Sequence, residues 1–262
     1  MSSGKKSGFG FADFKKFCGV VKVQVIPAID IKDGKCVRLL QGSFTAMTTY
    51  ADDPVEMALY FEEKGARKLH IVDLDGAQTG HPVNRSVVQE LVNAITIPVQ
   101  LGGGIRSLQQ IESWLNTGVT HIIVSTLAWQ SPESVVQALK QFGPDKIFLA
   151  VDMRDGKVSV WGWQEDTGLD PLKFLQPFKE AGLKRVIYTE ISRDGTLRGP
   201  DIAGLCSFAK KISVKITASG GISSLHDLEL LAKLSPPGVD SVIVGRAFYE
   251  GTLQPEEVFN AG

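Results

Sequence analysis

Two aspartates, each at the end of a short apolar run, are the residues of this chain best placed for acid–base chemistry. Asp30 ends the segment VIPAID and Asp152 ends the segment FLAVD. One carboxyl can act as a general acid and the other as a general base when their surroundings separate their pKa values. We therefore interpret Asp30 and Asp152 as a catalytic pair. Asp33 and Asp155, which precede glycines, are interpreted as turn residues instead.

Glycine runs follow two other apolar runs, and each has the chemistry of a phosphate site. Turns rich in glycine leave backbone N–H groups open to an anion, above all where a helix begins. A single run is more typical of a tight turn, but this chain carries two, each with another apolar run ending nearby. The sequence predicts two phosphate sites, formed by Gly102, Gly103, Gly104 and Thr126 and by Ser219, Gly220, Gly221, Gly245 and Arg246.

A barrel of parallel strands would bring these residues together. Continuous apolar runs are typical of strands buried on both faces, and they occupy residues 23–29, 68–74, 98–101, 121–125, 146–151, 185–190, 214–219 and 241–244. Helical patterns lie between them at residues 53–64, 107–116, 132–141, 171–181, 201–211 and 224–234. Eight such pairs predict an α/β fold, a (β/α)₈ TIM barrel with its site at the strand C-termini. A doubly wound sheet would usually place G-x-G-x-x-G after its first strand, where this chain has PAID.

The chain also repeats itself at half its length. Residues 25–35 align with 148–157, residues 101–105 align with 218–222, and residues 123–126 align with 243–246. The repeat predicts two half-barrels related by pseudo-twofold symmetry. Strands one and five of eight are diametrically opposed, so Asp30 and Asp152 should reach a substrate from opposite sides. The two phosphate sites should be opposed in the same way.

The composition excludes several function classes. The 262 residues carry 28 Lys and Arg against 29 Asp and Glu, a net charge of −1 that offers no attraction to nucleic acid or to anionic membranes. No apolar run approaches the ~18 residues of a membrane span. The three cysteines form no C-x-x-C pair, and the four histidines show no ligand spacing, so no metal site is expected and a reducing, cytoplasmic setting is the default. We expect a single barrel domain over residues 23–262 and an extra, flexible segment over residues 1–22.

The motifs together resemble one enzyme family. They are VIPAID at residues 25–30, HIVDLDGA at 70–77, GGGIR at 102–106, YTEISRDGT at 188–196 and SGGISS at 219–224. The chain resembles, from about Gln24 to its last helix, the phosphoribosylformimino-5-aminoimidazole carboxamide ribotide (ProFAR) isomerases of histidine biosynthesis. The resemblance implies a (β/α)₈ barrel that needs no cofactor and converts an aminoaldose into an aminoketose, an Amadori rearrangement. The expected partner is a small substrate with two phosphates, and the expected state is a monomer.

The resemblance also implies roles for individual side chains. Asp30 would take the C2′ proton of the sugar, Asp152 would protonate the ring oxygen, and Thr189 would hydrogen-bond the opening sugar. Trp163 would stack on the aminoimidazole, although a tryptophan beside Trp161 also suits a hydrophobic cover. The side chains expected to hold the polar and anionic parts of the substrate are Arg38 and Arg106.

Three alternatives stay open at this point. The related cyclase typically has Cys where this chain has Ala28 and Ser where it has Glu190, which favours the isomerase. A dual enzyme that also isomerises phosphoribosylanthranilate uses the same aspartates. A non-catalytic phosphosugar-binding barrel would lose the aspartates, which are present here.

Two features of the loops carry further expectations. Ser125 stands where the family usually has Gly, and its side chain would crowd a donor of the first phosphate site. Residues 32–52 exceed the usual ~2 to 6 residues of a βα loop. We expect this long segment and the Trp163 loop to close over the substrate.

Overall fold

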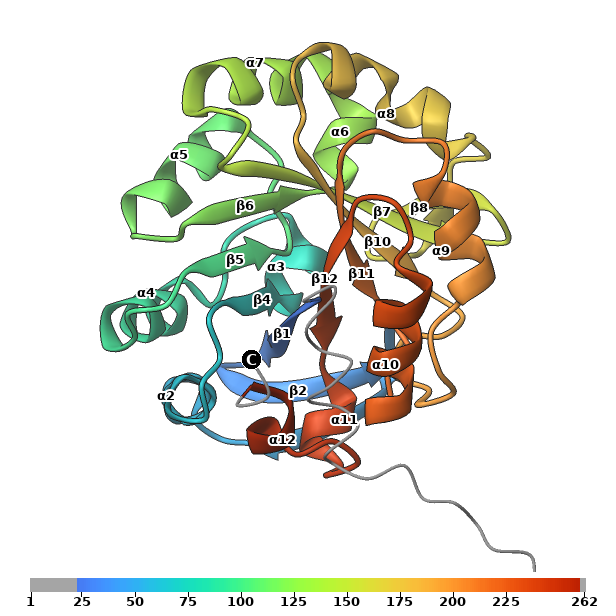
Figure 1. The fold of residues 1–262 in the computed structure, drawn as a ribbon. Coiled ribbons are helices and arrows are strands. Elements are labelled where there is room, and N and C mark those ends of the chain that lie inside the picture. Colours follow the sequence, from blue (N-terminus) through green and yellow to red (C-terminus); the bar gives the residue numbers. More distant parts are fainter. Residues whose placement is uncertain (1–22, 260–262) are drawn as a thin grey trace, which may run out of the picture.

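Eight parallel strands form a closed barrel at the centre of the molecule (Figure 1). The computed structural model describes residues 23–259. Each strand pairs in parallel with the next, and β12 pairs with β1 to close the ring. The strands are β1 (Gln24–Lys32), β4 (Leu69–Asp73), β5 (Val99–Gly102), β6 (His121–Val124), β7 (Ile147–Arg154), β10 (Arg185–Glu190), β11 (Lys215–Ser219) and β12 (Val239–Val244). The predicted (β/α)₈ barrel is confirmed, with every expected strand in place.

Helices surround the barrel and run between successive strands (Figure 1). Side chains predicted to open helices do so: Asp53 caps α2, Ser107 caps α5, and Ser224 forms a capping box with Asp227 at α10. The predicted helices are α2 (Pro54–Glu63), α5 (Leu108–Asn116), α7 (Pro132–Phe142), α8 (Pro171–Glu180), α9 (Ile202–Ala209) and α10 (Leu225–Leu234). The others are α3 (Leu74–Thr79), α4 (Arg85–Ala94), α6 (Thr126–Gln130), α11 (Arg246–Tyr249) and α12 (Pro255–Phe259).

Antiparallel extensions follow the first and fifth barrel strands, and they display the internal repeat. β2 (Lys35–Leu40) pairs with β1 and continues into β3 (Ser43–Ala51), while β8 (Lys157–Val160) pairs with β7 and continues into β9 (Glu165–Asp166). The turns match as well, because Asp33 and Asp155 have φ of 50° and 49°. This confirms that both aspartates are turn residues. The long segment after β1 is therefore a hairpin that extends the sheet.

The barrel interior contains an apolar layer that lies below the strand C-termini. Its six side chains come from five of the eight barrel strands, β1, β6, β7, β10 and β12, and all are at least 94% buried. They are Ile26, Ala28, Ile123, Phe148, Ile187 and Ile243. We call this set the interior plate. A second and larger core packs the outer faces of the strands against the helices.

The extra N-terminal segment expected over residues 1–22 lies outside the described residues. Within residues 23–259, no helix has the length and apolar character that a bilayer crossing requires.

Candidate active site

A cavity lies at the C-terminal ends of the barrel strands, and every site residue predicted from the sequence lines it. Asp30 and Asp152 lie on β1 and β7, which are opposite in the strand order of the ring. The two glycine runs follow β5 and β11, which are also opposite. The predicted residues lining the cavity are Asp30, Arg38, Gly102, Gly103, Gly104, Arg106, Thr126, Asp152, Trp163, Thr189, Ser219, Gly220, Gly221, Gly245 and Arg246.

Asp30 forms an ion pair with Arg38, at 2.7 Å between carboxylate and guanidinium. Arg38 is 9% exposed, donates a hydrogen bond to the Ala28 carbonyl and lies over the Tyr249 ring, 4.9 Å from its centroid. Burial opposes the charge of Arg38, but Asp30 offsets that cost, and the pKa of Arg38 is raised overall. A permanent cation thus faces the carboxylate of Asp30. The Arg38 guanidinium therefore fixes the position of the Asp30 carboxylate beside the cavity.

Asp152 has the opposite surroundings. Burial raises the pKa of its carboxyl to about 6, while hydrogen bonds from Thr189, Trp163 and Ser125 act in the lowering direction. Within the described residues, no Lys or Arg lies within ion-pair distance of Asp152. Thr189 is its register partner across the β7–β10 ladder, which explains their contact. A carboxyl with a pKa near neutrality suits a general acid.

Asp194 is a third carboxyl of the cavity, and the sequence interpretation missed it. Burial and the nearby charges of Asp30 and Asp152 raise its pKa to about 7, and Arg38 acts in the opposite direction. Asp194 precedes Gly195 in a loop, so its sequence signal was that of a turn. Only its placement between the two predicted aspartates distinguishes it. The cavity therefore contains two carboxyls with raised pKa values and one held by a cation.

The glycine runs are packed so closely that the loops have no room for a side chain. Gly104 has φ of 71°, and a Cβ there would collide with the Gly76 backbone. Gly221 has φ of 86°, and a Cβ there would collide with the Gly199 backbone. The same contact thus occurs in both halves of the barrel. Each loop presents its backbone toward the cavity, as an anion site requires.

The side chains at the two expected phosphate sites have other partners in the structure. The Thr126 hydroxyl accepts a hydrogen bond of 3.0 Å from the Trp161 backbone N–H. Arg246 donates to the Gly195 carbonyl at 2.6 Å and to Glu250 at 3.1 Å. Both residues begin short helices, α6 and α11. The first backbone N–H groups of a helix have no partner within the helix, so those at the starts of α6 and α11 are the groups of these segments that can still bind an anion.

Arg106 and Gly245 add two further features. The Arg106 guanidinium lies over the Trp161 ring at 5.1 Å, and its buried Nε has no hydrogen-bond partner among the described residues. Burial lowers the pKa of Arg106. A Cβ at Gly245 would lie 2.7 Å from Cζ of Arg38. Gly245 therefore makes room for the cation that holds Asp30, a role that the sequence did not indicate.

The two cavity loops meet above the site. Trp163, at a φ of 70°, lies so close to the β2–β3 turn that a Cβ at Gly42 would be 2.5 Å from its Cε3. At that turn, Gln41 donates to the Asp194 carbonyl at 3.2 Å and to the Ser192 carbonyl at 2.9 Å. The hairpin therefore spans from the Trp163 loop to the loop after β10.

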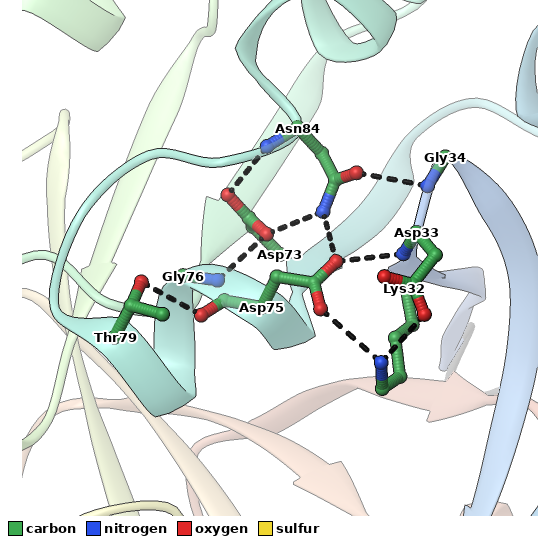
Figure 2. Close-up of polar contacts among 8 residues, drawn as sticks. All are labelled: Lys32, Asp33, Gly34, Asp73, Asp75, Gly76, Thr79 and Asn84. Atoms are coloured by element: carbon green, nitrogen blue, oxygen red, sulfur yellow. Dashed lines mark hydrogen bonds and ion pairs between the residues drawn. The ribbon is translucent and has the colours of Figure 1, made fainter.

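A buried polar network fixes the start of this hairpin to β4 and α3 (Figure 2). The Asn84 amide donates to Asp73 at 2.7 Å and to Asp75 at 2.8 Å, and its oxygen accepts from the Gly34 N–H at 3.0 Å. Asp75 also accepts from the Asp33 N–H at 2.7 Å. These contacts lock the β1–β2 turn, and thus the strand that carries Asp30, to the neighbouring strand.

The histidines of the chain differ in their surroundings. His70 is part of the cavity floor, hydrogen-bonds Gln100 at 3.1 Å and has its pKa lowered to about 3 by burial and by Arg38. His226 is exposed. Within residues 23–259, no group of three or more His, Cys, Asp or Glu side chains is arranged to hold a metal ion.

Comparison with known proteins gives consistent results. Residues 24–254 match the family described as histidine biosynthesis protein. Three relatives bear the name 1-(5-phosphoribosyl)-5-((5-phosphoribosylamino)methylideneamino)imidazole-4-carboxamide isomerase. The Desulforudis audaxviator protein is 45% identical over 87% of this chain and 87% of its own length. The Halothermothrix orenii protein is 47% identical over 91% and 99%, and the Gloeothece citriformis protein 45% over 91% and 93%.

The match to the family model covers far more than half of the chain, and the relatives exceed 40% identity over most of it. The fold, the paired half-barrels and the placement of the motifs around one cavity agree with this result. The chain belongs to the histidine biosynthesis protein family and, within it, to the ribotide isomerases that its motifs resemble.

Proposed function

We propose that this chain catalyses the Amadori rearrangement of the aminoaldose ProFAR to its aminoketose by acid–base catalysis. The observation that carries the proposal is the contrast between two opposed carboxyls in one cavity. The Asp30 carboxylate pairs with the Arg38 guanidinium at 2.7 Å, whereas Asp152 has no such cation among the described residues and burial raises its pKa to about 6. Pairs of titratable groups whose surroundings separate their pKa values mark the acid and the base of a site.

Each carboxyl then moves one proton. Asp152 donates its proton to the ring oxygen as the bond from C1′ to that oxygen breaks, which leaves a Schiff base at C1′. Asp30 removes the C2′ proton, and the electron pair of that C–H bond forms an enolamine. Tautomerisation of the enolamine gives the ketone at C2′ and a methylene at C1′, so no proton is gained or lost overall. Thr189, beside Asp152 in the β7–β10 ladder, is placed to hydrogen-bond the opened sugar.

The two glycine loops hold the phosphates of the substrate in this proposal. Because the loops after β5 and β11 lie on opposite sides of the ring, we infer a ligand with an anionic group at each end. A ligand that fills both sites lies across the cavity and over Asp30 and Asp152. Arg106 and Trp163 supply a cation and an aromatic face for the part between the phosphates.

Purified protein assayed in parallel with ProFAR and with phosphoribosylanthranilate tests the proposal. We expect turnover of ProFAR without any added metal or organic cofactor. An intact, cooperatively melting protein that converts neither substrate would contradict the proposed activity. Equal turnover of both substrates would support the dual-substrate alternative.

We also propose that the enzyme works in the cytoplasm as a monomer whose only required partner is the small-molecule substrate. All groups assigned to the reaction come from one chain and line one cavity. Light scattering on the active protein tests the monomer, which a stable dimer at assay concentration would exclude.

A further inference from the structure

A second cavity lies at the opposite end of the barrel, where the strands begin, and we call this end the N-terminal pole. Its lining includes Lys68, His121, Phe148, Arg185 and Lys215, which lie at or next to the starts of β4, β6, β7, β10 and β11. The interior plate lies between this cavity and the active site, and Phe148 belongs to both the plate and the pole. No step proposed for the isomerase uses these residues.

Cations dominate the N-terminal pole, and its carboxylates are already engaged. Asp240 forms two contacts with Arg185, at 2.5 and 2.7 Å, and lies 3.8 Å from Lys215. Lys184 and Asp145, which also line the cavity, pair with each other at 2.7 Å. Lys68 has no carboxylate within 4.0 Å of its Nζ among residues 23–259. The Lys68 ammonium group therefore belongs to the cavity lining without an ion-pair partner among the described residues, and the charge of Asp240 acts on it only from beyond 4.0 Å.

The surrounding fold stabilises the charge of Lys68 only in part. Burial lowers its pKa to about 8, Arg185 and Lys215 act in the same direction, and Asp240 acts in the opposite direction. The site is thus complementary to an anion that would raise this pKa again.

His121 adds a requirement for a proton on that anion. Its ring stacks on Phe148 at 4.7 Å, and burial lowers its pKa to about 4, so the imidazole is neutral. Its Nδ1 is buried and has no hydrogen-bond partner among the described residues. A neutral imidazole protonated at Nε2 can only accept at Nδ1. In that tautomer, a group that contacts Nδ1 must carry a donor.

We propose that the N-terminal pole binds one small, protonated oxyanion of the monohydrogen phosphate type. Its anionic oxygens accept from Lys68, and its O–H donates to Nδ1 of His121. Phe148 separates the bound anion from the interior of the barrel, since Lys68 Nζ and Arg185 Cζ each lie 5.7 Å from its ring centroid. The site is distinct from the two phosphate sites proposed for the substrate.

Lysine labelled with ¹³C at Cε allows the pKa of Lys68 to be followed by NMR in the intact protein, with Lys68→Met assigning its resonance. At constant ionic strength, inorganic phosphate should raise the midpoint by about 1 to 3 pH units relative to chloride, as expected for an opposite charge in direct contact. Sulfate, which has no O–H group at these pH values, should bind at least about tenfold more weakly, the cost of leaving a buried acceptor unpaired. The same midpoint in phosphate and chloride would overturn the proposal.

Matched variants separate this site from its alternatives. Lys184→Met, at the same cavity but in an ion pair with Asp145, should leave the phosphate response of Lys68 intact. His121→Phe should keep a response to both anions but lose the preference for phosphate, and a retained preference would overturn the role of His121. If Lys68→Met does not fold, Lys68→Arg assigns the resonance. Turnover of the Lys68 variant should match that of the unaltered enzyme, because the interior plate separates the two cavities.

Discussion

Asp30 and Asp152 have the same side chain but different surroundings. In the proposed reaction, Asp30 removes the C2′ proton and Asp152 protonates the ring oxygen. We expect Asp30→Asn and Asp152→Asn each to lower kcat by at least about 10²-fold with little change in substrate affinity, because general acid–base catalysis typically contributes ~10²- to 10⁴-fold. Steady-state kinetics with ProFAR measures both values. Asp194→Asn belongs in the same series, since its carboxyl also has a pKa raised to about 7.

The kinetics of the three aspartate variants can contradict the proposed roles in two ways. If either variant kept more than about a tenth of the original rate at saturating substrate, the role of that residue would be wrong. If Asp194→Asn lost more activity than Asp152→Asn, the ring-oxygen proton would belong to Asp194 instead. The Asp33→Asn variant serves as a control, because Asp33 lies in the β1–β2 turn.

The burial that prepares Asp152 for catalysis should cost stability. Its native pKa of about 6 exceeds the ordinary value of 3.8, so the native state binds this proton more tightly than the unfolded state does. Stability from this group is fully present below about pH 4 and is lost as pH rises to about 6. Asp152→Asn has no charge to bury and should be more stable above pH 6, on the order of 3 kcal/mol at ~1.4 kcal/mol per pH unit. Thermal melts from pH 4 to pH 8 measure the difference, and a Tm gain independent of pH would contradict the burial argument.

At the scale of elements, the hairpin β2–β3 and the Trp163 loop form the cover of the cavity. Trp163→Ala should weaken ProFAR binding by about 1 to 3 kcal/mol, the value of one base stacked on an aromatic ring. Gly42→Ala is the matched variant, because it displaces the indole without removing it and should weaken binding less. Isothermal titration calorimetry with each variant measures the affinity for ProFAR. Unchanged affinity in Trp163→Ala would show that the indole covers the cavity without stacking on the substrate.

The sequence predicted the elements well because their signals are local. Continuous apolar runs and helix caps such as Asp53 and Ser224 depend on neighbours within a few residues. The hairpin after β1 was expected only as a long loop, since Arg38 interrupts the apolar residues of β2 and the described part of β3 is mostly exposed. The Asn84 network was missed for another reason: it joins residues far apart in the sequence, and nothing in their spacing indicates the contact.

In the candidate site, too, some residues could be predicted from local sequence patterns and others could not. Asp30, Asp152 and the glycine runs are visible in the sequence because they end strands and because the two halves repeat them. Asp194 and the Arg38 contact with Gly245 depend on tertiary placement, which no local pattern encodes.

At the scale of the whole molecule, the two half-barrels should contribute equally to holding the substrate. Gly103→Ala and Gly221→Ala should each raise the KM for ProFAR, because a Cβ would push the loop backbone from its neighbour and misplace donors worth about 1.5 to 3 kcal/mol to a charged oxygen. Phosphoribosylanthranilate, if accepted, should respond to only one of them. Kinetics with both substrates measures the effect.

A control separates loop displacement from backbone strain. Gly156 has φ of 75° but open space around it, so Gly156→Ala adds strain without a collision and should leave KM unchanged. A co-crystal with ProFAR that shows one phosphate held by these loops and the other elsewhere would contradict the symmetric arrangement.

The interior plate is apolar, but the rest of the barrel interior also carries polar groups. Thr217 and Ser241 hydrogen-bond each other at 2.8 Å and bind Arg185 of the N-terminal pole, each at 2.9 Å. Asp152, in contrast, lines the cavity beneath the hairpin and the Trp163 loop. The opening of that cover should therefore set how fast Asp152 exchanges its proton with solvent, and a loop that moves more slowly would slow proton exchange as well as substrate entry.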